Sequence, residues 1–207
     1  MSGPARASIA RILPLAGLLA AGCLGLSKPY PEKRHFALEA PPRAEARAAA
    51  RRGVLRVNPF RVAPLFEGRE IVVRTGNAEY ESDFYNVWFV PPGPMLASAF
   101  EEWLRGAGVF EHVLSAGAVV DAGAVLGGLV TALHGDYGGE TARAVLGVDI
   151  HVVSGEDSPR ILLHRAYRRE VDIPVESAEA LALGLNDALR LVLADLEADL
   201  RKLEQPS

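Results

Sequence analysis

Hydrophobic residues in the last third of the chain change their spacing from every second position to every third or fourth. Between 143 and 153, apolar residues alternate with small or polar ones, at Leu146, Val148, Ile150 and Val152. This period of two predicts a strand with one buried face. The segment 154–159 is rich in turn-forming residues, so residues 160–173 are predicted to return as the second strand of a hairpin.

A long amphipathic helix is predicted after Pro174, which ends the sheet. Ser177 suits the N-cap position, and the helix should run to about Lys202. Its apolar stripe consists of Leu181, Leu185, Leu189, Val192, Leu196, Leu200 and Leu203. We expect this stripe to cover the sheet as core packing, and binding of a partner helix is the less favoured alternative.

Shorter elements fill the middle of the chain. Strand-like segments lie at 35–38, 54–62, 70–74, 78–81 and 125–133, and helical spacing runs from Met95 to Arg105. The Ala/Arg-rich stretch 41–52 fits either a loop or a frayed helix. Together these patterns predict an α+β fold: a single domain with a mostly antiparallel sheet, a mid-chain helix, and a long C-terminal helix packed on the sheet.

The N-terminus has the pattern of a secretory signal. Arg6 and Arg11 precede an apolar run, residues 12–21, that is about half as long as the ~20 residues of a membrane-spanning helix. The run closes on Leu19-Ala20-Ala21-Gly22-Cys23, which contains the only cysteine of the chain. No intramolecular disulfide can form, so this cysteine needs another explanation.

The segment before Cys23 resembles a lipobox, the site at which lipoprotein signal peptides are cleaved. It departs from that pattern at Ala20, where leucine is preferred; an ordinary secretory signal is the alternative interpretation. The resemblance implies acyl chains on Cys23, and Leu24 in place of an aspartate implies the outer membrane. We therefore predict a signal peptide at 1–22, a lipidated tether at 23–34, one domain at 35–203, and a disordered tail at 204–207.

Charge and polar residues exclude several other classes of function. Cleavage would remove two arginines and no acid, taking the formal charge from −4 to −6, which argues against nucleic acid and against electrostatic adhesion to anionic lipid. The five histidines lack metal-ligand spacing, and no nucleophile elbow or phosphate-binding loop occurs. His151 and His164 could pair across the hairpin, although solvent-facing positions are favoured. We expect no catalytic residue, no metal and no cofactor.

The middle and end of the chain carry a family resemblance. The matching stretches are Arg56-Val57-x-Pro59-x-Arg61-Val62-Ala63-Pro64, Glu70-Ile71-Val72-Val73-Arg74, Glu79-Tyr80-Glu81, Asp83-x-Tyr85-x-x-Trp88-x-x-Pro91 and Ala178-x-x-x-Ala182-x-x-x-Asn186-x-Ala188-Leu189. In this order, they resemble the ABC-type transport auxiliary lipoprotein family, which includes the paraquat-inducible protein C type. The chain departs from the family at Phe89-Val90, at the Pro91-Pro92 pair and in the insert 41–52.

This resemblance implies an accessory lipoprotein of an MCE-type ABC transport system that moves lipids or other hydrophobic molecules across the envelope. The protein would be anchored to the membrane by its acyl chains, would dock an MCE-domain protein facing the periplasm, and would not be an enzyme. Homo-oligomerisation is compatible with this role. A lipid-binding periplasmic lipoprotein and a structural lipoprotein of envelope assembly are the alternatives.

One aromatic segment is the candidate partner surface. Aromatic side chains near an arginine are typical of interface hot spots, here Arg74, Tyr80, Tyr85, Trp88 and Phe89. The competing interpretation is that Tyr85 and Trp88 are core residues that hold the mid-chain helix to the sheet.

Substituting Cys23→Ala tests the lipid anchor. We expect the variant to lose acylation and to move from the membrane fraction to the soluble fraction, because the acyl chains are the anchor that the resemblance implies. Fractionation with metabolic labelling by a fatty acid measures both effects. A variant that stays in the membrane fraction would show that the anchor lies elsewhere.

Overall fold

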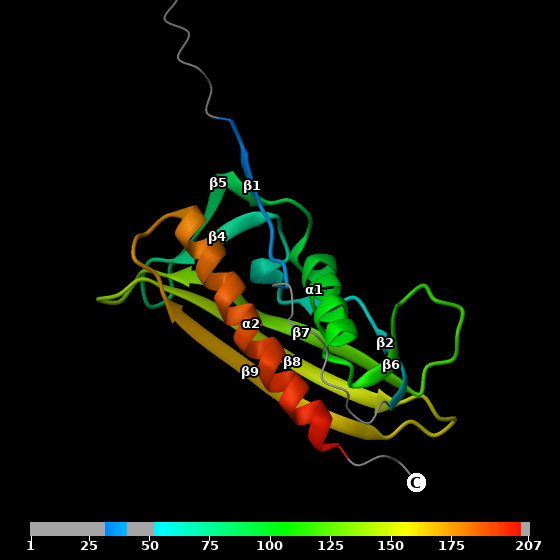
Figure 1. The fold of residues 1–207 in the computed structure, drawn as a ribbon. Helices are drawn as coiled ribbons and strands as arrows, with labels where there is room; N and C mark the ends of the chain where they lie inside the picture. The colour runs from blue at the N-terminus through cyan, green and yellow to red at the C-terminus, as the bar shows by residue number, and fades with distance from the viewer. Residues whose placement is uncertain (1–31, 41–51, 204–207) are drawn as a thin grey trace, which may run out of the picture. The chain divides into compact units, whose positions relative to one another are not determined.

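The computed structural model describes residues 32–40 and 52–203. The predicted signal peptide, Cys23, residues 41–51 of the insert 41–52, and the predicted tail therefore lie outside the described residues. The described part is a curled mixed sheet with both helices on one of its faces (Figure 1). The α+β prediction is confirmed.

Nine strands, two α-helices and one 3-10 turn make up the described part of the chain. The strands are β1 (Arg34–Phe36), β2 (Arg52–Val57), β3 (Arg61–Val62), β4 (Glu70–Arg74), β5 (Tyr80–Trp88), β6 (Phe110–Ser115), β7 (Ala124–Asp136), β8 (Arg143–Ser154) and β9 (Ile161–Asp172). The helices are the 3-10 turn η1 (Pro64–Phe66), α1 (Pro92–Ala107) and α2 (Ala178–Lys202).

Strand β7 is the centre of the sheet. On one edge it pairs antiparallel with β8 along its whole length, and β8 pairs antiparallel with β9, as the hairpin pattern predicts. On its other edge, β2, β3 and β4 pair with β7 one after another, all parallel. Pro59 separates β2 from β3, because a proline has no N–H to donate to the ladder. The sequence therefore predicted the antiparallel hairpin and strands at 54–62 and 70–74, but not the parallel pairing of these short strands with β7.

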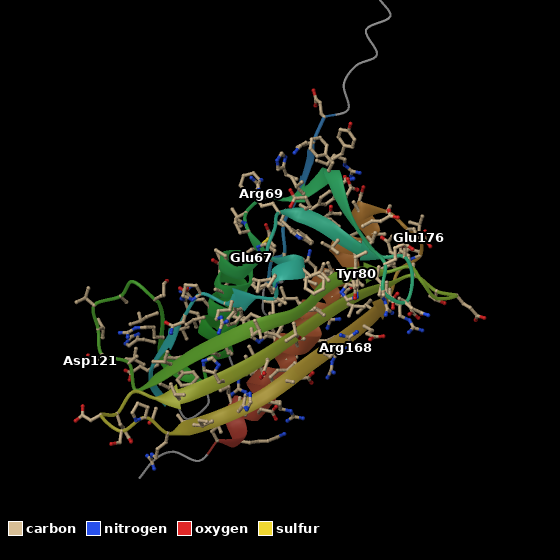
Figure 2. All side chains as sticks on the ribbon, turned by 180° about the vertical axis from the view of Figure 1, so that it is seen from behind. Glu67, Arg69, Tyr80, Asp121, Arg168 and Glu176 are labelled. Atoms are coloured by element: carbon tan, nitrogen blue, oxygen red, sulfur yellow. The ribbon has the colours of Figure 1, made fainter. Side chains whose placement is uncertain are left out.

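Helix α2 packs on β8, on the face of the sheet that carries both helices, which we call the inner face. This packing forms much of the core. Six residues of its predicted stripe are fully buried: Leu181, Leu185, Leu189, Val192, Leu196 and Leu200. Opposite them, Leu146, Val148 and Ile150 of β8 are equally buried. Ser177 is the N-cap, as predicted, since its Oγ accepts a hydrogen bond from the Ala180 N–H at 3.2 Å. Figure 2 shows the opposite face of the sheet, where Tyr80 and Arg168 lie.

The aromatic segment forms a longer strand than the sequence predicts. β5 extends over nine residues, where the pattern indicated only 78–81 as strand. Its first half pairs antiparallel with β4 and its last three residues pair parallel with β1. The chain then enters α1, which ends as predicted at a glycine, because Gly108 has the left-handed φ of 63°. None of the helices in the described part of the chain is long and apolar enough to cross a membrane.

Gly184 lets α2 approach the sheet closely. A Cβ at this position would lie 2.6 Å from Cγ2 of Ile173 and 2.8 Å from Cβ of Ala144. Both distances are well below van der Waals contact, and Ala144 cannot move without its backbone. A side chain here would have to separate the helix from β8.

The substitution Gly184→Leu should therefore destabilise the domain. We expect it to lower the free energy of unfolding by about 1–3 kcal/mol, the usual cost of overpacking a core. Ala194→Leu is the matched control, because residue 194 is exposed on the same helix and surface changes usually stay within about 0.5 kcal/mol. Urea unfolding measures both variants; equal stabilities would show that the helix and sheet are not closely packed at this point.

Candidate functional site

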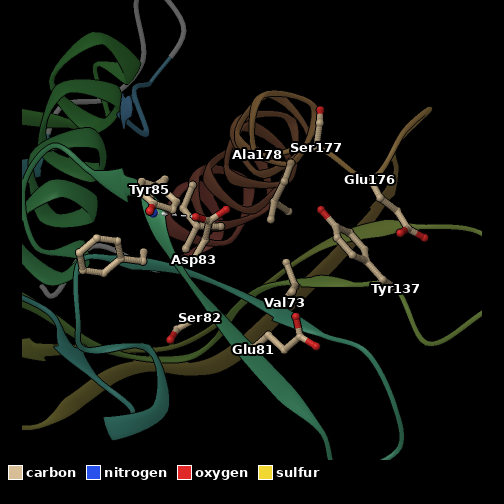
Figure 3. A pocket seen from close by; sticks show the side chains of 12 residues that line it. Val73, Glu81, Ser82, Asp83, Tyr85, Tyr137, Glu176, Ser177 and Ala178 are labelled. Atoms are coloured by element: carbon tan, nitrogen blue, oxygen red, sulfur yellow. Dashed lines mark hydrogen bonds between the residues drawn. The ribbon is translucent and has the colours of Figure 1, made fainter. Parts of the chain in front are cut away.

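A pocket of about 420 Å³ opens where α2 begins. Its floor is formed by Ile71 and Val73 of β4 and by Leu181 in the first turns of the helix. Ile71 and Leu181 are almost completely buried. Val73 and Ala178 are only partly buried, so they supply the apolar surface that stays open in the pocket. Figure 3 shows the pocket with α2 seen nearly end-on.

Three carboxylates stand around this floor. Glu81 and Asp83 point to the inner face of β5, because they pair in register with Val73 and Ile71 of β4. Glu176 approaches from the connection between β9 and α2, on the other side of the pocket (Figure 3). The walls thus come from segments about 90 residues apart in the sequence, which only the folded sheet brings together.

Asp83 is held in a fixed orientation. Its Oδ1 accepts hydrogen bonds from the backbone N–H of Tyr85 at 2.8 Å and of Asn86 at 2.9 Å, and its Oδ2 accepts one from the Asn86 side chain at 2.7 Å. Burial raises the pKa of Asp83, but the hydrogen bonds from Asn86 and Tyr85 outweigh burial and leave the pKa below its usual value. The carboxylate is therefore charged at neutral pH.

Tyr137 forms part of the opposite wall. Burial raises the pKa of its phenol, and the negative charges of Glu176 and Asp83 raise it further. The hydroxyl thus remains a neutral hydrogen-bond donor at neutral pH. Tyr85, which is 39 % exposed, supplies a second aromatic ring at the rim.

The composition of the pocket favours a group that is both apolar and positively charged. An aliphatic stem can lie on the floor while its cation lies among the carboxylates and against the aromatic rings. A lysine or arginine side chain has this chemistry. No cluster of three or more His, Cys, Asp or Glu side chains in metal-binding arrangement occurs within 32–40 and 52–203.

The five residues of the predicted partner surface do not form one patch. Arg74 and Tyr80 are register partners on the outer face of the sheet, whereas Tyr85 lies at the pocket rim on the inner side. Trp88 is only 2 % exposed, in agreement with the alternative that it is a core residue, and Phe89 is 66 % exposed. Whether any of them binds a partner stays a prediction.

Arg74 and Tyr80 belong to a cluster on the outer face. The Arg74 Nε donates to Oδ1 of Asp136 at 3.1 Å, and this hydrogen bond holds the pKa of Asp136 below its usual value. His134 stacks on Phe66 with ring centroids 5.3 Å apart and meets the Tyr80 ring edge-on at 5.7 Å. Arg74 therefore pairs with a carboxylate of its own domain.

The histidine pair that the sequence suggested across the hairpin is present, and both side chains are exposed. His151 and His164 are register partners on β8 and β9, and both are exposed to solvent, as the favoured interpretation held. The Nε2 of His164 lies 2.9 Å from Oδ1 of Asp149.

Sequence reasoning did not single out the pocket. Glu81 and Asp83 appeared only within the family motifs, and Tyr137 and Glu176 had no role assigned. The register of β4 on β5 is the signal that would have placed the two acids over Val73 and Ile71.

Residues 36–197, which include the pocket, match the family described as ABC-type transport auxiliary lipoprotein component. The chain belongs to this family. Comparison with curated protein sequences gave no significant match. The family is one of lipoproteins of the cell envelope, and its description assigns them an auxiliary part in ABC-type transport.

Two solved structures have the same fold as this auxiliary lipoprotein. Protein XCC0632 from Xanthomonas campestris, of the DUF330 family, superposes with a TM-score of 0.67 at 19 % identity, covering 79 % of this chain and 92 % of that one. An uncharacterised protein superposes with a TM-score of 0.65 at 16 % identity, covering 82 % and 99 % of the two chains. At these identities, the likeness shows the fold alone.

The stability of this auxiliary lipoprotein should fall in mild acid because of His134. Burial lowers its pKa to about 4, from 6.5 for an accessible histidine. Between these two values the unfolded chain binds a proton that the folded chain does not, so stability is full above pH 6.5 and is lost as the pH falls toward 4. The difference corresponds to about 3 kcal/mol.

We expect His134→Phe to remove this part of the pH dependence while keeping a ring against Phe66. Urea unfolding at pH 7.0 and pH 4.5 measures the difference for each chain, and His112→Phe, at an exposed position of β6, is the control. An equal loss of stability in wild type and His134→Phe would assign the pH dependence to other groups.

Proposed function

We propose that this protein is a lipid-anchored accessory component of an MCE-type ABC transport system that moves lipids or other hydrophobic molecules across the envelope. Acyl chains on Cys23 would hold it to the outer membrane, with the domain facing the periplasm. The domain would dock an MCE-domain protein and take no part in catalysis. The observation that carries this proposal is the family match over residues 36–197, in a chain that has a lipobox-like segment at Cys23.

The pocket at the start of α2 is the docking site that the geometry favours. Its apolar floor can bury part of an inserted side chain, and the fixed Asp83 carboxylate can pair with a cation on that side chain. Charge pairs with a well-ordered partner contribute more than flexible surface pairs. We infer that the MCE-domain partner inserts a lysine or arginine, with a neighbouring apolar residue, into this pocket.

Two observations support docking over direct binding of lipid by the domain. Lipid binding requires a large apolar cavity between helix and sheet, whereas the α2 stripe is fully buried against β8 along its length. The pocket that does open there has carboxylates at its rim, and burying acyl chains beside them would cost desolvation. A structural role in envelope assembly would use the same lipid anchor. The identity of the protein that the domain binds distinguishes this role from the transport role.

A pulldown from membranes tests both the function and the docking site. Detergent-solubilised wild-type protein should recover an MCE-domain protein. The double variant Glu81→Lys/Glu176→Lys should recover about tenfold less, because it places two cations where the partner's cation would bind. Glu111→Lys/Asp157→Lys is the control: it makes the same change of charge at two exposed positions at the far end of the sheet.

The outcomes separate the two parts of the proposal. Recovery of no MCE-domain protein by the lipidated wild type would contradict the transport function. If the pocket variant recovers as much MCE-domain protein as the control variant, the transport function stands and the pocket is not the docking site.

A further inference from the structure

Two phenylalanines are strongly exposed at the end of the domain where the chain enters it. Phe84 is 62 % exposed and Phe89 is 66 % exposed. Large exposed aromatic side chains that lie close together mark a surface that contacts a protein or a membrane. Both flank β1, the first strand of the domain, which begins two residues after Glu32.

Two side chains on one side of the chain, at and just before β1, contact these two rings. The Nζ of Lys33 lies 4.1 Å from the centroid of the Phe84 ring, in cation–π contact. The His35 ring meets the Phe89 ring edge-on at 6.0 Å. Lys33 and His35 are two residues apart on an extended chain, so they point to the same side. The four side chains thus form one surface, which we call the entry patch.

The opposite face of β1 holds this strand to the domain. Arg34 forms an ion pair with Glu179 of α2 at 3.0 Å, across 145 residues of sequence. Farther along, the Leu38 N–H donates to Sδ of Met95 at 3.2 Å, and Leu38 is buried. The entry patch is therefore fixed on the folded domain and is not part of a loose arm.

Arg69 adds a second cation beside the patch. Its Nε donates to the Trp88 carbonyl oxygen at 2.9 Å, next to Phe89, and the residue is exposed. Figure 2 shows it at the end of the domain where β1 enters. Glu81 and Asp83 point to the other face of β5, and Phe84 lies between the two surfaces, because it also borders the pocket.

The sequence places the membrane anchor close to this patch. Eight residues, 24–31, separate Cys23 from Glu32. The eleven residue steps from Cys23 to Arg34, where β1 begins, span at most about 40 Å when fully extended. A lipid on Cys23 would therefore keep the start of β1 within that distance of the bilayer at all times, and the entry patch would meet that surface at a high effective concentration.

We propose that the entry patch rests in the interface of the same membrane that holds the acyl chains. Aromatic rings favour the headgroup level of a bilayer, and lysine or arginine beside them can reach lipid phosphates. The acyl chains and the patch then make two contacts with one membrane, which fixes the orientation of the domain on it. This inference rests on the proposed lipid anchor.

Depth measurement with a spin label tests the contact. The acylated Cys23 has no free thiol, so Phe89→Cys in the lipidated full chain gives one position for a nitroxide label. The protein is reconstituted into vesicles of phosphatidylethanolamine and phosphatidylglycerol at 3:1. Val119→Cys, at a fully exposed position between β6 and β7, is the control. Power-saturation EPR then measures how often the nitroxide at each position collides with oxygen and with a water-soluble nickel complex.

We expect collisions of the label at 89 with the nickel complex to be about threefold or more fewer than those at 119, with oxygen collisions retained, as for a group at headgroup depth. Adding Phe84→Ser should return the label at 89 toward the value at 119, because it removes the remaining phenylalanine of the patch. Leu65→Ser is the matched control, since Leu65 is 50 % exposed and lies on η1.

Three results would overturn the proposal. A chain that floats with the vesicles but whose label at 89 is as accessible as that at 119 overturns the membrane contact alone. Protection at 89 that arises only when a purified MCE-domain protein is added assigns the patch to a protein partner instead. A chain that does not float with the vesicles overturns the lipid anchor together with this inference.

Discussion

The packing of α2 on the inner face of β8 is the contact on which the rest of this structure depends. It buries an apolar stripe along the helix against alternate residues of the strand, and Gly184 brings the two backbones close enough for this to happen. Polar contacts then fix the helix along its length. Asp199 accepts hydrogen bonds from Arg165 at 2.7 Å and from the Tyr167 hydroxyl at 3.0 Å, both on β9. The helix cannot slide or rotate without breaking both sets of contacts.

The start of this helix determines where the pocket opens. Ser177 caps α2 beside β4 and β5, and the pocket opens there over Ile71, which is buried, and Val73, which is partly exposed. The alternation of β5 then divides its side chains between two functions. Glu81 and Asp83 point toward the pocket, whereas Phe84 lies against Lys33 in the entry patch. One strand thus supplies a surface suited to a protein partner and another suited to a membrane.

The sequence predicted the positions of most strands and of α1 and α2, but it did not predict the parallel pairing of the short strands. Leu146, Val148 and Ile150 showed the period of β8 directly, and the leucine stripe showed α2. The short strands β2, β3 and β4 carry too few residues to show a period, and their parallel pairing is set by β7 rather than by their own pattern. The same limit applies to the site. Five neighbouring residues looked like one partner surface, but alternation along the strands and the turn into α1 place them on both faces of the sheet, with Trp88 in the core.

The proposed function requires that the pocket of the lipid-anchored domain bind an MCE-domain protein. Site-specific photo-crosslinking in living cells tests it most directly, with a photoreactive phenylalanine analogue in place of Tyr137 at the pocket wall. Thr131, which is exposed on β7 away from the pocket, is the control position. We expect irradiation to produce an adduct between the pocket position and an MCE-domain protein, with none from position 131. An MCE-domain adduct from neither position, or from position 131 alone, would contradict the account.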